Sequence, residues 1–178
     1  MSVFYIYLIS SLPQLSFAGS APFSLESFLV RCRDLISVQD NQALEDLCRQ
    51  DIDVLAQSPK GCLKDWVRFE IGLRNELVRL RAKDKKVDPA KFLRSGDYPS
   101  AHLSFIALNA HRHSGHLLES EKILDQERWN FLDQLSFGHY FDFDFLLIYA
   151  LKLKILERWE KIASADQERL YRQALILN

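Results

Sequence analysis

The clearest pattern along the chain is a series of apolar residues spaced three or four apart over residues 63–86, which predicts an amphipathic helix. Its apolar stripe consists of Leu63, Trp66, Leu73, Leu77 and Leu80, widened by Val67 and Phe69. Glu70 lies four residues before Arg74, a spacing that favours an ion pair on the exposed edge of the helix. Cations occupy the C-terminal end, where the helix dipole favours them: Arg79, Arg81, Lys83, Lys85 and Lys86.

A second helical block follows from Leu117 onward. Its first stripe is Leu117, Leu124, Phe131, Leu132 and Leu135, and Gly138 is the expected stop. Asp142 or Asp144 is then expected to cap a long helix with two apolar faces, which must be covered on two sides by its own domain or by a partner. Residues 164–167 fit a capping box, which predicts that a separate last helix begins there.

The remaining elements are shorter. The apolar run over residues 3–9 predicts a buried N-terminal strand or short helix that ends near Pro13. Ser24 and Asp40 are expected to cap two helices, and Asp88-Pro89 starts a short third one. A further helix is expected over residues 101–110. The loop at residues 95–99 is the candidate boundary if the single domain, residues 1–178, divides into two lobes.

Composition supports a helical, folded protein. The chain is 48% hydrophobic and 26% charged, it contains only five prolines and six glycines, and it has no threonine. We therefore expect an all-α, mostly helical, bundle-like fold, with the N-terminal strand or short helix as its only variation. A net charge of −1 gives no general attraction for nucleic acid or anionic membrane.

The three cysteines indicate a reducing compartment. Cys32, Cys48 and Cys62 are an odd number at wide spacing without a CxxC pair, which favours reduced, buried thiols over disulfides. The N-terminal apolar run followed by small residues resembles a signal peptide, but no basic residue precedes Arg31. The run is also too short to span a bilayer, which needs about 20 residues. We therefore expect a cytoplasmic protein without a membrane span.

Candidate chemistry is sparse. The sequence lacks the glycine-rich loops that hold nucleotides and the GxSxG motif of a nucleophile elbow, so we expect no cofactor and no catalysis. His111, His113 and His116 are weak metal candidates, because a structural zinc site requires four ligands and no cysteine is near in sequence. Asp142 and Asp144 could form an acid–base pair, but their position favours helix capping.

Several residues are better explained as contacts with a protein partner or as core. Arg74, Arg79 and Arg81 form either a solvated basic helix end or a patch for an acidic protein, because no aromatic residues lie among them to stack on bases. Trp129, Tyr149 and Trp159 lie on helical faces, where core packing is the default and interface anchoring is the alternative. These six residues are the candidate partner interface.

Several stretches carry a family resemblance. They are Tyr5-Ile-Tyr-Leu-Ile-Ser-Ser-Leu-Pro-Gln-Leu-Ser-Phe17, Phe69-Glu-Ile-Gly-Leu-Arg-Asn-Glu-Leu77, Leu124-Asp-Gln-Glu-Arg-Trp-Asn-Phe-Leu-Asp133, Phe141-Asp-Phe-Asp-Phe145 and Tyr149-Ala-Leu-Lys-Leu-Lys-Ile-Leu-Glu-Arg-Trp159. Together they resemble a bacterial family of uncharacterised proteins encoded in V-type ATPase gene clusters. That family resembles the C/d subunit of the V-type ATPase, a helical socket that joins the rotor's central shaft to the membrane ring. The C/d subunit is a longer, three-lobed funnel.

The resemblance implies a non-catalytic structural or accessory subunit that links the soluble motor to the membrane ring in ion transport. The implied partners are other ATPase subunits, and the implied location is cytoplasmic, peripheral to the inner membrane through the complex. The alternative is a free-standing helical interaction or assembly adaptor. A third hypothesis, an enzyme or metalloprotein using His111, His113, His116 and Asp142, is disfavoured because no pair of groups is placed to tune the other's pKa.

Overall fold

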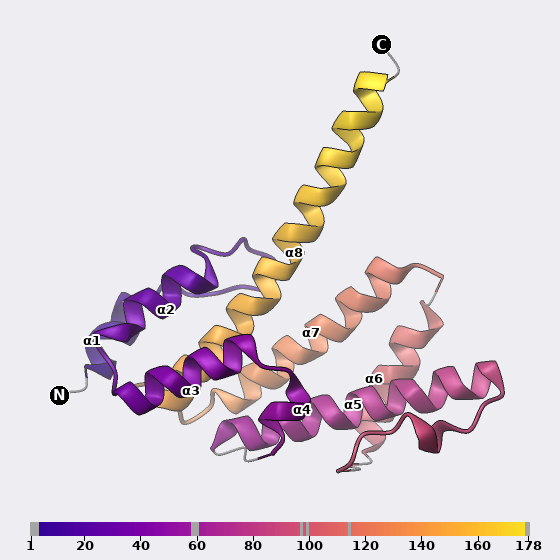
Figure 1. Ribbon diagram of the computed structural model, residues 1–178, viewed down its shortest axis with the longest axis horizontal. Coiled ribbons are helices and arrows are strands. Elements are labelled where there is room, and N and C mark those ends of the chain that lie inside the picture. Colours follow the sequence, from indigo (N-terminus) through magenta and orange to yellow (C-terminus); the bar gives the residue numbers. More distant parts are fainter. Residues whose placement is uncertain (1–3, 58–60, 97, 99, 114, 177–178) are drawn as a thin grey trace. The chain divides into compact units, whose positions relative to one another are not determined.

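The computed structural model describes residues 4–57, 61–96, 98, 100–113 and 115–176. All regular elements in these ranges are helical, so the predicted all-α fold class is confirmed. The chain divides into two compact units. Unit 1 consists of Met1–Arg49 and Gly138–Asn178, and unit 2 consists of Gln50–Phe137. Unit 2 is therefore inserted in the sequence between two halves of unit 1, as the colour order in Figure 1 shows.

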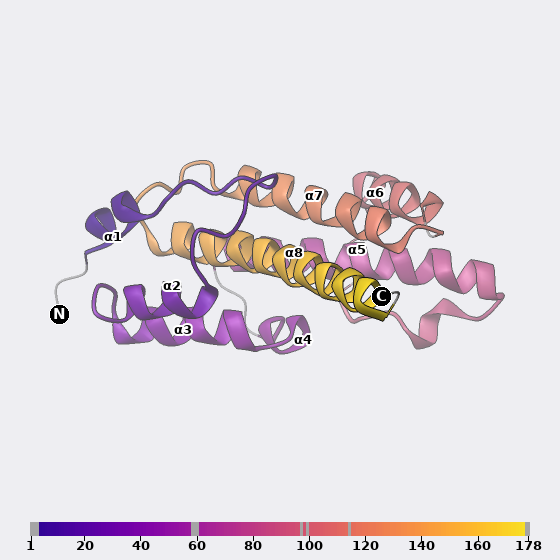
Figure 2. The same cartoon turned by 90° about the horizontal axis from the view of Figure 1, so that it is seen from above.

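Unit 1 is built around one long helix. Its elements are α1 (Tyr5–Ser11), α2 (Leu25–Arg33), α3 (Val38–Arg49) and α8 (Phe143–Ile176). Helices α2 and α3 pack against each other and against α8, and Figure 2 shows them running beside its first half. The N-terminal apolar run is thus a short helix, one of the two predicted forms.

Polar side chains fix where the helices of unit 1 begin. Ser24 caps α2 as predicted, because its hydroxyl accepts a hydrogen bond from the backbone N–H of Ser27. The predicted cap of α3 is wrong by one turn. Ser37 accepts from the backbone N–H of Asp40 and donates to its carboxylate, so Asp40 lies inside the first turn as the reciprocal partner of Ser37.

Helix α8 is continuous from Phe143 to Ile176, so the separate last helix predicted from residues 164–167 is wrong. That segment contains neither proline nor glycine, and a capping-box sequence does not by itself end a helix. Both predicted apolar faces are buried in the N-terminal half, where Leu146, Ile148, Tyr149, Leu151 and Leu153 are all buried. From Ala163 to Ala165 the helix is exposed.

Unit 2 contains α4 (Ile52–Leu55), α5 (Cys62–Lys85), the 3-10 helix η1 (Pro89–Lys91), α6 (Ala101–Arg112) and α7 (Leu117–Leu135). Helix α6 packs against both α5 and α7. Gly72 allows the close approach of α5 and α6, because a Cβ atom there would lie 2.6 Å from Leu103 Cδ1. Asp88 caps η1 as predicted.

The loop predicted as a boundary between lobes lies inside unit 2, although residues 97 and 99 are outside the described ranges. The buried side chain of Asn75 holds the start of this loop to α5. Its amide donates to the carbonyl of Arg94 (3.1 Å) and its oxygen accepts from the Arg94 N–H (2.9 Å). The chain passes between the units at residues 49–50 and 137–138.

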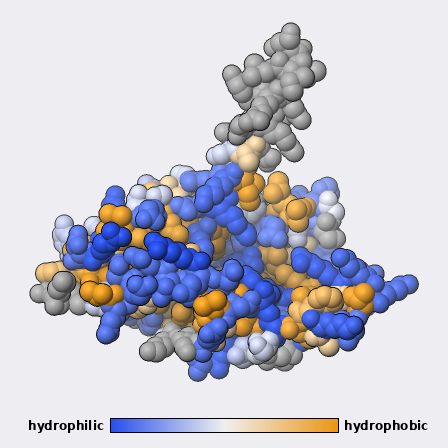
Figure 3. All heavy atoms as spheres, in the orientation of Figure 1, coloured by the Kyte–Doolittle hydropathy of each residue, from blue (hydrophilic) through white to orange (hydrophobic). Residues whose placement is uncertain are grey.

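Within the described residues, no helix combines the length and the apolar character needed to cross a bilayer. On the face shown in Figure 3, apolar side chains lie among hydrophilic ones.

Candidate functional site

A buried ionic cluster in unit 2 joins α5 to α7. Arg128 of α7 donates from Nε to Glu70 Oε1 (2.5 Å) and from Nη1 to Asp125 Oδ1 (2.9 Å). Glu70 and Asp125 are buried, and Arg74 reaches Glu70 Oε2 at the edge of the cluster (3.4 Å). Burial lowers the pKa of the Arg128 guanidinium, but the charges and hydrogen bonds of Glu70 and Asp125 outweigh burial and raise it.

This cluster corrects one prediction about Glu70. The spacing to Arg74 predicts that Glu70 lies on an exposed edge, whereas Glu70 is 4% exposed and its carboxylate makes its shorter contact with Arg128. The helical period could not reveal this, because the partner lies 58 residues away. With both carboxylates hydrogen-bonded to Arg128, the cluster serves to tie two helices together.

The three arginines predicted as a partner patch lie along α5 and differ in their contacts. Arg74 pairs with Glu70, and Arg79 pairs with Glu76 at 2.5 Å. Arg81 is exposed. Two of the three charges are therefore already matched by acidic side chains of the same helix, which weakens any basic patch on this surface.

The three aromatic interface candidates are more buried than a surface anchor would be. Trp129 and Tyr149 are each 5% exposed, and Trp159 is half-buried with the Arg158 guanidinium 6.0 Å from its ring centroid. Tyr149 stacks on Phe28 and Phe145 and donates its hydroxyl to the carbonyl of Pro13 (3.0 Å). In the folded chain, Trp129 and Tyr149 act as core residues, and Trp159 keeps accessible surface.

The histidines of the α6–α7 turn do not converge. His111 Nε2 lies 2.9 Å from Asp84 Oδ2, and His113 Nδ1 lies 2.9 Å from the carbonyl of Asn109. His116 is exposed at the start of α7. In the part of the chain that the structure describes, no three His, Cys, Asp or Glu side chains are grouped so as to hold a metal ion.

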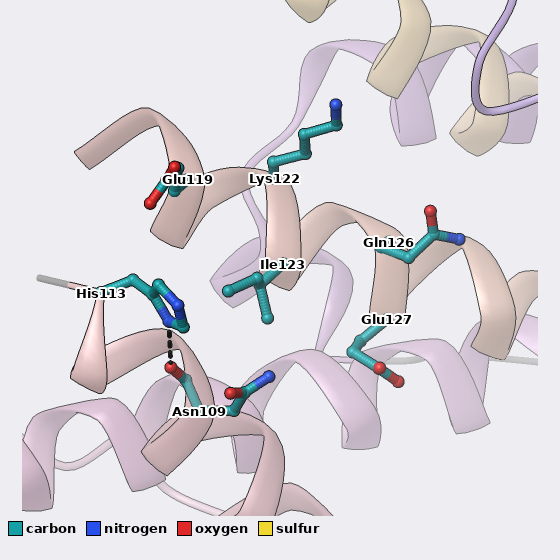
Figure 4. Close-up of a pocket in the computed structure, with 7 residues that line it drawn as sticks. All are labelled: Asn109, His113, Glu119, Lys122, Ile123, Gln126 and Glu127. Carbon is teal, nitrogen blue, oxygen red and sulfur yellow. Dashed lines mark hydrogen bonds between the residues drawn. The ribbon is translucent and has the colours of Figure 1, made fainter. Parts of the chain in front are cut away.

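A shallow groove of about 470 Å³ lies between the end of α6 and α7, and most of the residues that line it are of polar type. Figure 4 shows their side chains: Asn109, His113, Glu119, Lys122, Ile123, Gln126 and Glu127. The His113 ring is directed back to Asn109, and the side chain of Lys122 points away from both of these residues. The groove therefore offers mixed charge around Ile123, without a nucleophile beside a base.

A larger groove of about 730 Å³ in unit 2 is more apolar. The stacked rings of Phe69 and Phe131, with centroids 4.2 Å apart, form part of its wall, together with Leu103 and Leu135. Arg68 lies at its rim over the ring of Tyr98 (5.4 Å). Its apolar wall can hold an apolar group, and polar side chains that include Asp65, Ser100 and Gln134 complete the lining.

The turn before α8 combines a fixed backbone with exposed aromatic rings. Asp142 caps α8, as predicted, by accepting from the N–H of Phe145 (3.0 Å), and its second oxygen lies 2.6 Å from His139 Nδ1. The hydrogen bond from His139 to Asp142 raises the pKa of His139, assisted by the charge of Asp144 and opposed by slight burial. Tyr140 and Phe141 between them are exposed. The spacing of apolar residues does not predict that Tyr140 and Phe141 are exposed, because that spacing indicates only which side of a helix is buried.

Comparison with known proteins gives one match. A family model described as "Protein of unknown function (DUF2764)" matches residues 97–177, which is less than half of the chain and covers α6, α7 and α8. No curated protein and no solved structure matches the chain.

Proposed function

We propose that this chain is a non-catalytic structural or accessory subunit of a bacterial V-type rotary ATPase, similar in role to the C/d subunit. In this role it helps to link the soluble motor to the membrane ring during ion transport. Its partners are other ATPase subunits at the central shaft and ring, and it is located in the cytoplasm, held near the inner membrane through the complex.

The observation that carries a docking role is the amount of large apolar side chain left exposed on a folded, helical chain. Exposed apolar rings and aliphatic side chains occur in both units, and the most exposed are Phe137, Val38, Tyr7, Leu117, Phe105 and Ile6. Where such side chains gather into one patch, the surface of a folded protein is suited to contact a partner. The five segments that resemble proteins of V-type ATPase gene clusters indicate which complex supplies that partner.

The placement of these segments also supports a structural role. The residues that resemble the family in α5, α7 and α8 include Glu70, Asp125 and Tyr149, which stabilise the two units internally. A link that transmits torque must resist deformation, and closely packed helices with satisfied buried polar groups have low compressibility.

A quantitative purification tests the proposal against the adaptor alternative. The V-type ATPase is isolated through a tag on its central shaft from cells that express this chain at its natural level, and subunit ratios are measured by mass spectrometry with labelled standards. The proposal expects a fixed ratio of this chain to the shaft protein across growth phases. A ratio that varies with assembly state favours the adaptor, and consistent absence from the complex contradicts the proposed structural or accessory role.

A further inference from the structure

Large exposed apolar side chains of unit 1 gather at one end. Six of the seven in the described part of unit 1 lie on α1, at the start of α3, or in the turn before α8, and we name this set the α1 patch: Phe4, Ile6, Tyr7, Val38, Tyr140 and Phe141. The seventh, Val30, lies on α2. Helix α1 and the start of α8 lie at the same end of unit 1 in both ribbon views (Figures 1 and 2).

Helix α1 presents its part of the patch in a fixed orientation. A seven-residue helix is not stable alone in water, so contacts with the rest of unit 1 must hold it. Leu8 and Ile9 are buried, the N–H of Phe4 donates to the carbonyl of Leu35 (2.9 Å), and the Tyr5 hydroxyl donates to Asp40 (2.5 Å). These anchors leave Ile6 and Tyr7 outward, with 66% and 69% of their surface exposed.

The turn before α8 presents Tyr140 and Phe141 in the same fixed way. Its two ends are joined by the contact between His139 and Asp142, and Asp142 also caps α8. The turn leads directly into α8, whose start lies at the same end of unit 1 as α1 in both ribbon views (Figures 1 and 2). Two anchored segments thus hold five exposed apolar side chains in fixed positions. Such a surface loses less conformational entropy on binding than flexible chain ends would.

The surroundings of the patch are acidic. Asp34 is exposed next to Leu35, whose carbonyl anchors Phe4. Asp40 accepts the hydroxyl of Tyr5 in α1, and Asp142 and Asp144 both lie beside His139 at the start of α8. An anionic bilayer is disfavoured by this rim, because aspartates repel negatively charged headgroups. A protein surface with an apolar centre and a rim of lysine or arginine is complementary to it.

We infer that the α1 patch is the surface through which this chain docks on a protein subunit whose apolar contact residues are surrounded by lysine and arginine. The inference rests on the proposed function, because it assigns a docking surface to the same protein. It places the docking surface at one end of unit 1. The arginines of α5 and the tryptophans are not part of that surface.

The test compares full-length tagged chains expressed in the native cell in place of the untagged protein. Tyr7→Asp and Tyr140→Asp, singly and together, place charge at the centre of the patch. Val30→Asp is the matched control, since Val30 is a comparably exposed apolar residue of unit 1 outside the patch. Asp34→Lys reverses one charge of the rim. Thermal unfolding followed by circular dichroism establishes that each variant remains folded.

The readout is the amount of ATPase subunits recovered per tagged chain, with a photo-crosslinking residue placed at position 140 to identify the contacted peptide. We expect the double variant to lose about tenfold or more of the recovered subunits, as loss of a central anchor does. Asp34→Lys should lose less, and more at low salt than at high salt. Val30→Asp should match the unmodified chain, and the crosslinked peptide should contain lysine or arginine near apolar residues.

Three results overturn the inference, and they differ from one another. Equal recovery by the double variant and the control rejects the α1 patch and leaves the proposed function standing. Recovery of no ATPase subunit by the unmodified chain rejects the proposed function, and the inference with it. Binding to phosphatidylglycerol vesicles that the double variant loses, without any change in subunit recovery, assigns the patch to lipid.

Discussion

Both units join helices through stacked aromatic rings, and unit 2 adds a buried ionic cluster to them. In unit 1, α8 is held to α2 by a column of rings, in which Phe28 stacks on Tyr149 at 5.2 Å and Phe23 stacks on both. In unit 2, the rings of Phe69 and Phe131 stack between α5 and α7 with centroids 4.2 Å apart, and the buried cluster of Glu70, Arg128 and Asp125 joins the same two helices. An apolar contact loses stability roughly in proportion to the area removed, whereas a buried ionic cluster depends on every partner being present.

The largest expected effect comes from breaking the ionic cluster. Arg128→Met leaves two buried carboxylates without their guanidinium, and we expect it to lower the free energy of unfolding of unit 2 by about 3–5 kcal/mol. Hydrogen exchange of α5 and α7 peptides measures the loss separately from unit 1. Arg81→Met on the exposed face of α5 is the control, with a change within about 0.5 kcal/mol.

Removing all three charges of the cluster together tests how much net stability the cluster contributes. If the cluster contributes little net free energy once desolvation is counted, the triple variant Glu70→Leu, Asp125→Leu and Arg128→Met should recover most of the loss. A triple variant no more stable than Arg128→Met would show that the hydrogen bonds themselves hold α5 and α7 together.

Truncating a side chain in the apolar core of unit 1 should lower the free energy of unfolding somewhat less than Arg128→Met does in unit 2. Leu153 of α8 is fully buried, and Leu153→Ala is expected to lower the stability of unit 1 by about 3 kcal/mol, through lost burial and the cavity left behind. Val30→Ala on the exposed side of α2 should change it by less than about 0.5 kcal/mol. Protection of α2 and α8 peptides against exchange should fall while that of α5 and α7 stays constant. Equal loss in both units would mean that they unfold as one.

A smaller effect is expected where α5 and α6 approach each other. In Gly72→Ala, the added Cβ would lie 2.6 Å from Leu103 Cδ1 and 3.1 Å from the backbone oxygen of Tyr98, and the backbone has little freedom to yield. We expect a loss of about 1–3 kcal/mol by overpacking, measured by urea unfolding. Gly115→Ala is the matched control, because nothing lies within 4 Å of its Cβ position. A neutral Gly72→Ala would contradict the close packing.

The smallest expected effect is a pH dependence at the start of α8. The pKa of His139 is raised, chiefly by its hydrogen bond to Asp142, so the folded state binds the proton more tightly than the unfolded state. The resulting stability is fully present below about pH 6.5 and is lost as pH rises through the folded pKa. The pair is partly exposed, so a few tenths of a kcal/mol are expected. His139→Gln should abolish this slope between about pH 6 and 8, and an unchanged slope would assign it to another group.

The spacing of apolar and capping residues predicted those features that depend on residues within a single helix. The all-α class, the caps at Ser24, Asp88 and Asp142, and the two buried faces of α8 all depend on residues within one or two turns. It failed where the determining partner is distant. Glu70 was placed at the surface because Arg128 is invisible to a local pattern, and α8 was divided at residues 164–167 because a capping box also occurs within helices.

The candidate interface shows the same limit. Residue type singles out aromatic and arginine side chains as interface candidates, but Trp129 and Tyr149 are core residues and Arg74 and Arg79 are paired within α5. The α1 patch is assembled from segments more than 100 residues apart, so the patch as a whole has no signature in the sequence. One signal for its α1 part is present in the sequence. If residues 5–11 form a short helix that is buried on one side through Leu8 and Ile9, then the apolar residues Ile6 and Tyr7 must lie on its exposed side.

The ratio of ion transport to ATP hydrolysis tests the central claim most directly. It is measured in membrane vesicles from cells that carry the gene for this chain, from cells that lack it, and from complemented cells. A protein that links motor to ring predicts that loss of the chain lowers ATP-driven ion uptake per ATP hydrolysed, and that complementation restores it. The same ratio with and without the chain, at equal amounts of assembled motor and ring, would contradict the proposed link.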